Sequence, residues 1–471
     1  MNKLYPSTLY NVRIAASVLV AKYQLGLGVL AIPSTFATLG FVPGLISLFA
    51  LIVITTYGGL QSAYIRQDYR SIFSIGDVGY LLFGTFGREL IGVCYWIFVC
   101  LCTGASFLTF SISLVTISNN AICSLYFAAI AAIFLIIVGI FTRTLERVSW
   151  TGWLGIMSIL VAVFTTTIAV LAQDRPYAAP PNTTDYGIRA FEAPSFSKAM
   201  TAVCAQLVSL AGSATFFSIS AEMKRPEDFH KSILLGQSFV AFIYVLIGCI
   251  VYGRVGVYVT SPALASAGPL IGKIAYGLAI PGVLVTSIIY SHAGAKYTFV
   301  RLLRNTRHLE KSTMVHWITW VGSLTFLAII GFVVAASVPF FNDLMGLIGA
   351  LLGSLFSIIV PTFTSIYRRA ARSEAQRLER QHQEQSEEFH QQTVSVSTSS
   401  SPSKRRHWFI RGLPGLDGQP FSMLRFSRAS IDYIFMILGF YCLVAGTYAS
   451  VQAILDSYAT GNVSAPFTCA A

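Results

Sequence analysis

The sequence predicts an all-α membrane protein with eleven transmembrane helices. Of its 471 residues, 55% are hydrophobic and only 11% are charged, whereas soluble domains carry about 25% charged residues. Apolar runs of about 20 residues, the length that crosses a bilayer, recur along the chain. The net charge of +12 comes from basic residues between these runs, which indicates membrane topology rather than a nucleic-acid partner. The first run is too long for a secretory signal peptide.

Each predicted span is an apolar run long enough to cross the hydrocarbon core. The eleven spans cover residues 13–38, 43–65, 90–117, 121–141, 150–172, 198–221, 232–255, 269–300, 313–338, 343–366 and 430–455. The first, sixth and eighth runs are long enough to be tilted or interrupted. The polar segment 368–411 cannot bury a core. It is predicted to be a cytoplasmic spacer, with disorder at 391–403 and a short charged helix at 374–388.

The distribution of lysine and arginine predicts that the N-terminus is cytoplasmic and the C-terminus is outside. Two of the 32 basic residues lie within spans. Those in the outside segments are only Arg175, Arg189, Lys198, Arg254 and Lys273. The sequons at Asn182 and Asn462 both fall in outside segments, as glycosylation requires. We expect the plasma membrane rather than the vacuolar membrane as the location.

Two predicted spans contain sequences that interrupt a helix. In the first, Gly26, Gly28 and Pro33 fall close together, and in a helix interior glycine costs about 1 kcal/mol and proline about 3 kcal/mol. In the sixth, Ser209–Thr215 is small, polar and contains a glycine. Freed backbone groups are costly in lipid, so such breaks are buried or line a watery cavity, and in transporters they mark the substrate site.

The two interruptions lie at equivalent positions, five spans apart. An odd offset inverts the second copy, so spans one to five and six to ten are predicted to form an inverted repeat with the eleventh appended. The predicted divisions are 1–172 for the first repeat, 173–366 for the second, 367–428 for a partly disordered cytoplasmic loop, and 429–471 for the last helix and a short outside tail.

The breaks predict a site for an amino-acid zwitterion. Amides of Gly26–Leu30 suit a carboxylate and carbonyls near Ser209–Gly212 suit an amine, because a broken helix exposes both kinds of group. The candidate binding residues are Gly26, Leu27, Gly28, Val29, Ser209, Ala211, Gly212, Ser213, Thr215, Phe216 and Phe217, with Phe107 and Tyr290 as further wall candidates. The alternative is that the glycines only allow helices to pack closely.

Three segments resemble the fungal amino acid/auxin permease family. They are Lys22–Pro33, Phe217–Phe229 with its Glu-Met-x-x-Pro pattern, and Ser291–Arg301. The resemblance covers nearly the whole chain and is nearest to the fungal neutral amino acid permeases. It implies a LeuT-like fold with discontinuous helices 1 and 6, and secondary transport that is often proton-coupled. The N-terminus is shorter than in many relatives, which puts N-terminal regulation in doubt. Fungal relatives also move amino-acid-derived metabolites, so the resemblance does not name the substrate.

Ionisable residues inside spans are functional hypotheses by default. No Asp or Glu lies in the middle of a predicted span, whereas Lys22 and Lys296 do. A fixed ammonium can occupy space that a sodium ion fills in sodium-coupled relatives, which predicts sodium-independent, proton-linked or facilitative transport; the alternative is that both lysines snorkel to the headgroups. The other coupling or gating candidates are His292, as a proton relay or a packing residue, and Glu222, as a gate partner or a solvated helix end.

Secondary active transport of neutral amino acids, by alternating access, is the leading prediction. Two alternatives stay open: transport of an amino-acid-derived metabolite such as an alkaloid, and a non-transporting nutrient sensor on the same fold. An enzyme is not predicted, because the spans lack paired acids, metal ligands or a Ser–His arrangement. The eight cysteines lack ligand spacing and are predicted to be buried small hydrophobes. No metal or cofactor is expected, and the oligomeric state is left open.

Overall fold

The computed structural model describes residues 13–142, 145–181, 183–223, 226–304, 306–309, 311, 313–338, 340–391, 423–459 and 467. Every regular element within these ranges is helical, which confirms the predicted all-α fold. Ten helices are long and apolar enough to cross a membrane, and the candidate spans number eleven if one bent pair is counted as a single span. All eleven predicted spans therefore coincide with helices.

The first half of the chain contains the first five candidate spans. Its helices are α1 (Arg13–Leu25), α2 (Gly28–Leu39), α3 (Phe41–Asp68), α4 (Ile75–Ile117), α5 (Ser124–Phe141) and α6 (Leu145–Ala172). Helix α4 begins well before residue 90, where its span was predicted, because Ser74 and Asp77 form a capping box that starts a helix there. It is kinked at Gly84, whose φ of 70° suits only a residue without a side chain.

The second half contains the remaining six candidate spans. Its helices are α7 (Phe196–Ser209), α8 (Ser213–Glu222), α9 (Phe229–Val255), α10 (Pro269–Leu302), α11 (Met314–Ser337), α12 (Phe341–Ile348), α13 (Val360–Gln391) and α15 (Met423–Ala459). Short 3-10 turns lie at Pro226–Asp228, Gly256–Tyr258 and Ala263–Ala267. Two π-helical segments, η4 (Gly349–Gly353) and η5 (Leu355–Ile359), join α12 to α13 within the tenth span.

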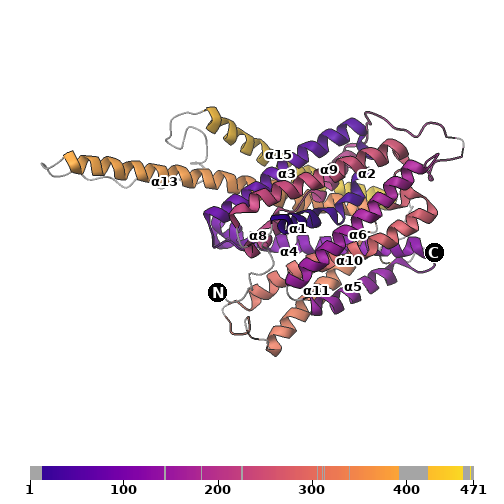
Figure 1. Ribbon diagram of the computed structural model, residues 1–471, viewed down its shortest axis with the longest axis horizontal. Helices are drawn as coiled ribbons and strands as arrows, with labels where there is room; N and C mark the ends of the chain where they lie inside the picture. The colour runs from indigo at the N-terminus through magenta and orange to yellow at the C-terminus, as the bar shows by residue number, and fades with distance from the viewer. Residues whose placement is uncertain are drawn as a thin grey trace.

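The polar segment after the tenth span is helical for longer than predicted. Helix α13 continues unbroken to Gln391, so the charged helix expected at 374–388 is confirmed, whereas the loop expected from residue 367 is wrong as far as residue 391. Residues 368–391 are rich in Ala, Arg, Glu and Gln, which are strong helix formers, and contain no Gly or Pro to end the helix. Figure 1 shows α13 projecting away from the bundle as an arm. Residues 392–422 of the predicted loop lie outside the described residues, and its last residues, 423–428, are helical because α15 begins at Met423.

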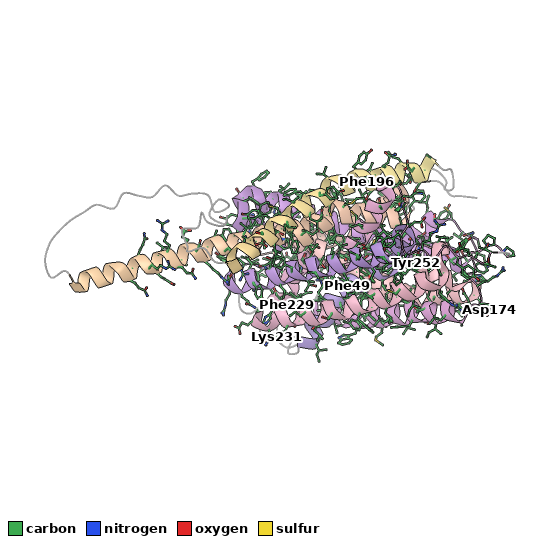
Figure 2. The ribbon with its side chains drawn as sticks, turned by 90° about the horizontal axis from the view of Figure 1, so that it is seen from above. Phe49, Asp174, Phe196, Phe229, Lys231 and Tyr252 are labelled. Carbon is green, nitrogen blue, oxygen red and sulfur yellow. The ribbon has the colours of Figure 1, made fainter. Side chains whose placement is uncertain are left out.

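Residues predicted to be cytoplasmic and residues predicted to be outside lie at opposite ends of the bundle. Figure 2 places Phe229 and Lys231 toward the end from which α13 projects, and Tyr252 and Asp174 toward the opposite end. Helix α9, which contains both Phe229 and Tyr252, therefore runs from one end to the other as a membrane span must. Lys231 and the arginines of α13, all predicted to be cytoplasmic, share one end.

Burial distinguishes the central spans from the peripheral ones. In the most apolar window of Phe196–Phe217, 94% of the residues are buried, against 33% in Ser124–Phe141 and 28% in Ala429–Ala459. Apolar side chains left exposed on such a bundle face lipid rather than water. The interrupted sixth span is therefore central, and the eleventh helix lies on the periphery.

The cysteines follow the sequence prediction only in part: Cys94 and Cys249 are free thiols that are half-buried. Cys100, Cys102, Cys204 and Cys442 are buried free thiols, as expected. Cys123, however, is disulfide-bonded. The span predicted to begin at residue 121 begins only at Ser124, so Cys123 lies before the helix rather than within the apolar bundle.

Candidate functional site

The first span is interrupted at Gly26 and Leu27, where sequence analysis predicted a break. Helices α1 and α2 are bent by 49° relative to each other. A methyl group on Gly26 would lie 2.6 Å from the Thr286 hydroxyl oxygen of α10, so the break can approach α10 this closely only because residue 26 is glycine.

The sixth span is interrupted over Leu210–Gly212. Helix α7 ends at Ser209 and α8 begins at Ser213, and the amides of Leu210 and Ala211 close tight turns onto Leu207 and Val208. This break is less bent than the first, since Phe196–Phe217 still qualifies as one span. Both predicted interruptions are therefore present, and they differ in how far the two halves turn.

The two breaks touch each other. A methyl group on Gly28 would lie 2.8 Å from Cα of Ser209, and the Ser209 hydroxyl lies 3.4 Å from the Gly28 carbonyl oxygen while donating to Ala205 at 2.7 Å. The Gly28–Ser209 contact brings the N-terminus of α2 against the C-terminus of α7. One helix N-terminus and one helix C-terminus therefore meet at this contact.

Tyr244 of α9 joins the two breaks and was missed by sequence analysis. Its hydroxyl oxygen lies 2.7 Å from the Gln24 carbonyl and 2.9 Å from the Ser209 carbonyl. A phenol has one proton, so it can satisfy only one of these carbonyls at a time. A tyrosine within a long apolar run carries no sequence signal that would have placed it here.

The predicted binding residues lie in or next to the two breaks. Gly26, Leu27, Gly28 and Val29 line the first break, Ser209, Ala211, Gly212, Ser213 and Thr215 line the second, and all are buried. Phe216 faces Gly212, because a methyl group on that glycine would lie 2.8 Å from the Phe216 ring. Phe217 is buried in the main apolar core.

The two further wall candidates have different positions. The Tyr290 hydroxyl donates to the Tyr23 carbonyl at 3.0 Å, in the last turn of α1, and the two rings meet edge to face. Phe107 instead packs near Gly331 of α11. Of these two, Tyr290 is therefore the one that the fold brings to the first break.

Lys22 lies fully inside the bundle, one turn before the first break. Its side chain is 1% exposed, and its Nζ donates to the Thr286 hydroxyl at 3.0 Å and to the Gly282 carbonyl at 3.3 Å. A methyl group on Gly155 of α6 would lie 2.7 Å from Cε of Lys22. These contacts exclude snorkelling for Lys22 and place its amino group between α1, α6 and α10.

The other coupling candidates lie apart from this contact or outside the described residues. Lys296 is half-buried on α10. His292, one turn earlier, is buried and meets Trp320 edge to face, and its Nδ1 has no partner among the described residues. Glu222 ends α8, and its side chain lies outside the described part. Asn182 and Asn462 lie outside the described residues as well.

A buried carboxylate was also missed. No acidic residue was predicted in the middle of a span, but α15 begins at Met423, before the predicted residue 430, so Asp432 lies well inside the helix. Its side chain is fully buried and pairs with Arg369 Nη1 at 2.7 Å and with the Ser365 hydroxyl at 3.0 Å, and it also accepts a hydrogen bond from Tyr57. We call these four residues the Asp432 cluster.

An all-helical membrane bundle in which two interrupted spans meet at the centre is the arrangement of membrane transport proteins. A family model described as transmembrane amino acid transporter protein matches residues 13–385, and the chain belongs to this family. It is therefore an integral, multi-pass membrane protein, as the resemblance to the permeases predicted. Family membership also implies a transporter rather than an enzyme.

Fungal relatives match over nearly the full chain. A protein named "Transmembrane transporter" from Gibberella moniliformis is 31% identical, and the match covers 97% of this chain and 86% of that protein. A protein of the same name from Fusarium pseudograminearum is 30% identical over the same shares. The Neurospora crassa "N amino acid transport system protein" is 29% identical, over 96% of this chain and 87% of that protein.

Proposed function

We propose that the protein is a secondary active transporter that carries neutral amino acids by alternating access. The contact between the two interrupted spans at Gly28 and Ser209 carries the proposal, because paired broken helices are the backbone of transporter binding sites. The proposal includes a LeuT-like inverted repeat, with 1–172 and 173–366 as its halves and 429–471 appended. The printed name of the Neurospora crassa relative supports an amino acid as the substrate.

The geometry at the contact fits both ends of a zwitterion. The first amides of α2, at Gly28 and Val29, lack acceptors within their own helix and lie at the positive end of its dipole, which suits a carboxylate. The carbonyls of Gln24 and Ser209 converge on one Tyr244 proton, so one of them is left to accept from an ammonium group. Opposite charges are thus accommodated on the two sides of one contact.

The buried ammonium of Lys22 supports sodium-independent transport. It is fixed by Thr286 and Gly282 between α1 and α10, beside the first break. A second cation brought to the same space would be repelled by this charge. We therefore propose that the coupling ion is a proton, with Lys22 as the main coupling residue and Lys296, His292 and Glu222 as further candidates.

We propose a cytoplasmic N-terminus and an outside C-terminus, in the plasma membrane. The charge pattern supports this orientation, since Lys231 and the arginines of α13 share one end of the bundle. The disulfide-bonded Cys123 supports it too, because disulfides persist in oxidising compartments and this residue lies between α4 and α5, on the side predicted to be outside. Asn182 and Asn462 stay proposed glycosylation sites on that side.

The test is uptake by the purified protein in proteoliposomes. One labelled neutral amino acid is offered without sodium, with and without an inward proton gradient, against a panel of unlabelled competitors. The proposal expects accumulation above equilibrium that depends on the proton gradient. Competition by an alkaloid but by no amino acid would indicate that the substrate is an amino-acid-derived metabolite rather than an amino acid. Saturable binding without accumulation would instead identify a sensor.

A further inference from the structure

Gln24 presents an unpaired carboxamide between the two breaks. It lies in the last turn of α1, is 2% exposed, and neither its Nε2 nor its Oε1 has a hydrogen-bond partner among the described residues. The Nε2 atom would lie 3.0 Å from a methyl group on Gly212, so the amide faces the second break. Buried polar groups are nearly always hydrogen-bonded, and one that is not requires an explanation.

Other buried glutamines have hydrogen-bond partners that Gln24 lacks. Gln206 of α7 uses its Nε2 toward Thr35 and Gly44 and accepts from Ser47 through its Oε1. Gln237 of α9 leaves only its Oε1 unpaired. Within the described residues, a buried glutamine that lacks partners on both amide atoms occurs only at the point where the two interrupted spans meet.

A series of contacts connects the second break to the residue before Gln24 through three aromatic side chains. Ser213, the neighbour of Gly212, donates to the Phe356 carbonyl at 2.6 Å in the π-helical segment η5. The Phe356 ring meets Phe98 of α4, and Phe98 meets Tyr290. Tyr290 bonds the carbonyl of Tyr23, which precedes Gln24. π-helical turns of this kind occur frequently at functional sites.

We infer that Gln24 is a specificity-determining residue whose carboxamide hydrogen-bonds the side chain of the substrate. The inference rests on the proposed transport function and narrows its substrate class. The backbone groups of the breaks serve the carboxylate and the ammonium, so the Gln24 amide is left for the rest of the substrate. A carboxamide offers one acceptor and two donors without charge, so it selects uncharged side chains that carry a hydroxyl or an amide.

The test compares amino acids that differ by one polar group. Serine against alanine, threonine against valine, and tyrosine against phenylalanine compete for uptake of one labelled substrate in sodium-free proteoliposomes. A site built to hydrogen-bond a polar group rejects the analogue that lacks it. We expect the wild-type protein to bind the polar member of at least one pair about tenfold or more tightly. In Gln24→Leu this ratio should fall to about one.

Two further variants separate selectivity from folding. Gln24→Asn keeps the chemistry and should retain the direction of the preference, whereas Gln237→Leu makes the matched change at another buried glutamine and should keep the wild-type ratio. A wild-type protein that transports amino acids but shows no preference within any pair would overturn the inference alone. Equal ratios in the wild type and Gln24→Leu would overturn it too. Absence of amino-acid transport by a folded wild-type protein would instead count against the proposed function.

Discussion

Two buried polar regions of this protein are satisfied in opposite ways. In the Asp432 cluster, both carboxylate oxygens have partners from α3 and α13. At the central contact, the Gln24 amide has none, and two carbonyls share one tyrosine proton. A buried carboxylate with partners on both oxygens helps to hold a fold in one arrangement, whereas a buried amide without any partner costs free energy until something binds it. The first region therefore stabilises the bundle, and the second is arranged for a ligand.

The largest effect is expected at Asp432, whose two carboxylate oxygens both have partners. Asp432→Ala leaves the Arg369 charge without its partner, and removing one member of a buried ion pair costs about 3 kcal/mol or more. We expect a marked fall in the thermal unfolding temperature of the detergent-purified protein. The apparent KM of molecules that still fold should stay unchanged. A change in substrate preference without loss of stability would contradict the division between the two regions.

Gly28→Ala should reduce transport, whereas Asp432→Ala should mainly reduce stability. The new methyl group would collide with the Tyr244 hydroxyl and with Cα of Ser209, and neither helix can yield without separating the breaks. We expect uptake to fall about a hundredfold, equal to about 2.7 kcal/mol, as measured by initial rates in proteoliposomes.

Gly277→Ala is the matched control for Gly28→Ala, because a methyl group on this glycine of α10 meets no atom within 4 Å. It should transport at the wild-type rate. If Gly28→Ala also transports normally, the two breaks do not need to touch, and the site must lie elsewhere in the bundle.

Lys22→Met tests whether the buried ammonium takes part in coupling. The variant removes a charge held by Thr286 and Gly282 while keeping an unbranched side chain. We expect uptake to lose its stimulation by an inward proton gradient, measured as the ratio of initial rates with external pH 5.5 and 7.5 at fixed internal pH. Lys273→Met, at a half-buried lysine bonded to Asn119, should keep that ratio. If the proton gradient stimulates uptake by Lys22→Met as strongly as uptake by the wild type, Lys22 is not the coupling residue.

Most of the fold was predictable from the sequence, because lipid imposes long apolar runs and a strong charge bias between them. The break at Gly26 and Gly28 was predictable for the same reason, since glycine and proline are conspicuous inside such a run. The Asp432 cluster was not predictable, because Asp432 lies inside a helix only if that helix starts earlier than hydropathy indicates. Hydropathy alone does not detect a capping box such as Ser74 with Asp77, or helix-forming polar sequence such as that of α13.

The central partners were unpredictable for a different reason. Tyr244 lies 220 residues from the Gln24 carbonyl that it bonds, and Thr286 lies 264 residues from Lys22. Contacts at these separations depend on how helices pack, which periodicity does not encode. The lack of hydrogen-bond partners for the Gln24 amide is likewise a property of the packed bundle, because the sequence does not show which groups a glutamine will contact.

Tyr244→Phe provides the most sensitive test of the central region. Loss of one hydroxyl leaves the carbonyls of Gln24 and Ser209 without their common donor, so they are no longer held toward one point. We expect the apparent KM to rise about tenfold, equal to about 1.4 kcal/mol, with little change in unfolding temperature. Tyr252→Phe is the control on the same helix, since that hydroxyl contacts the backbone of Arg189 at the far end of α9. If both variants change KM equally, the Tyr244 hydroxyl has no special role in substrate binding. The Gln24 amide would then be the one unpaired group left to support a ligand site at the central contact.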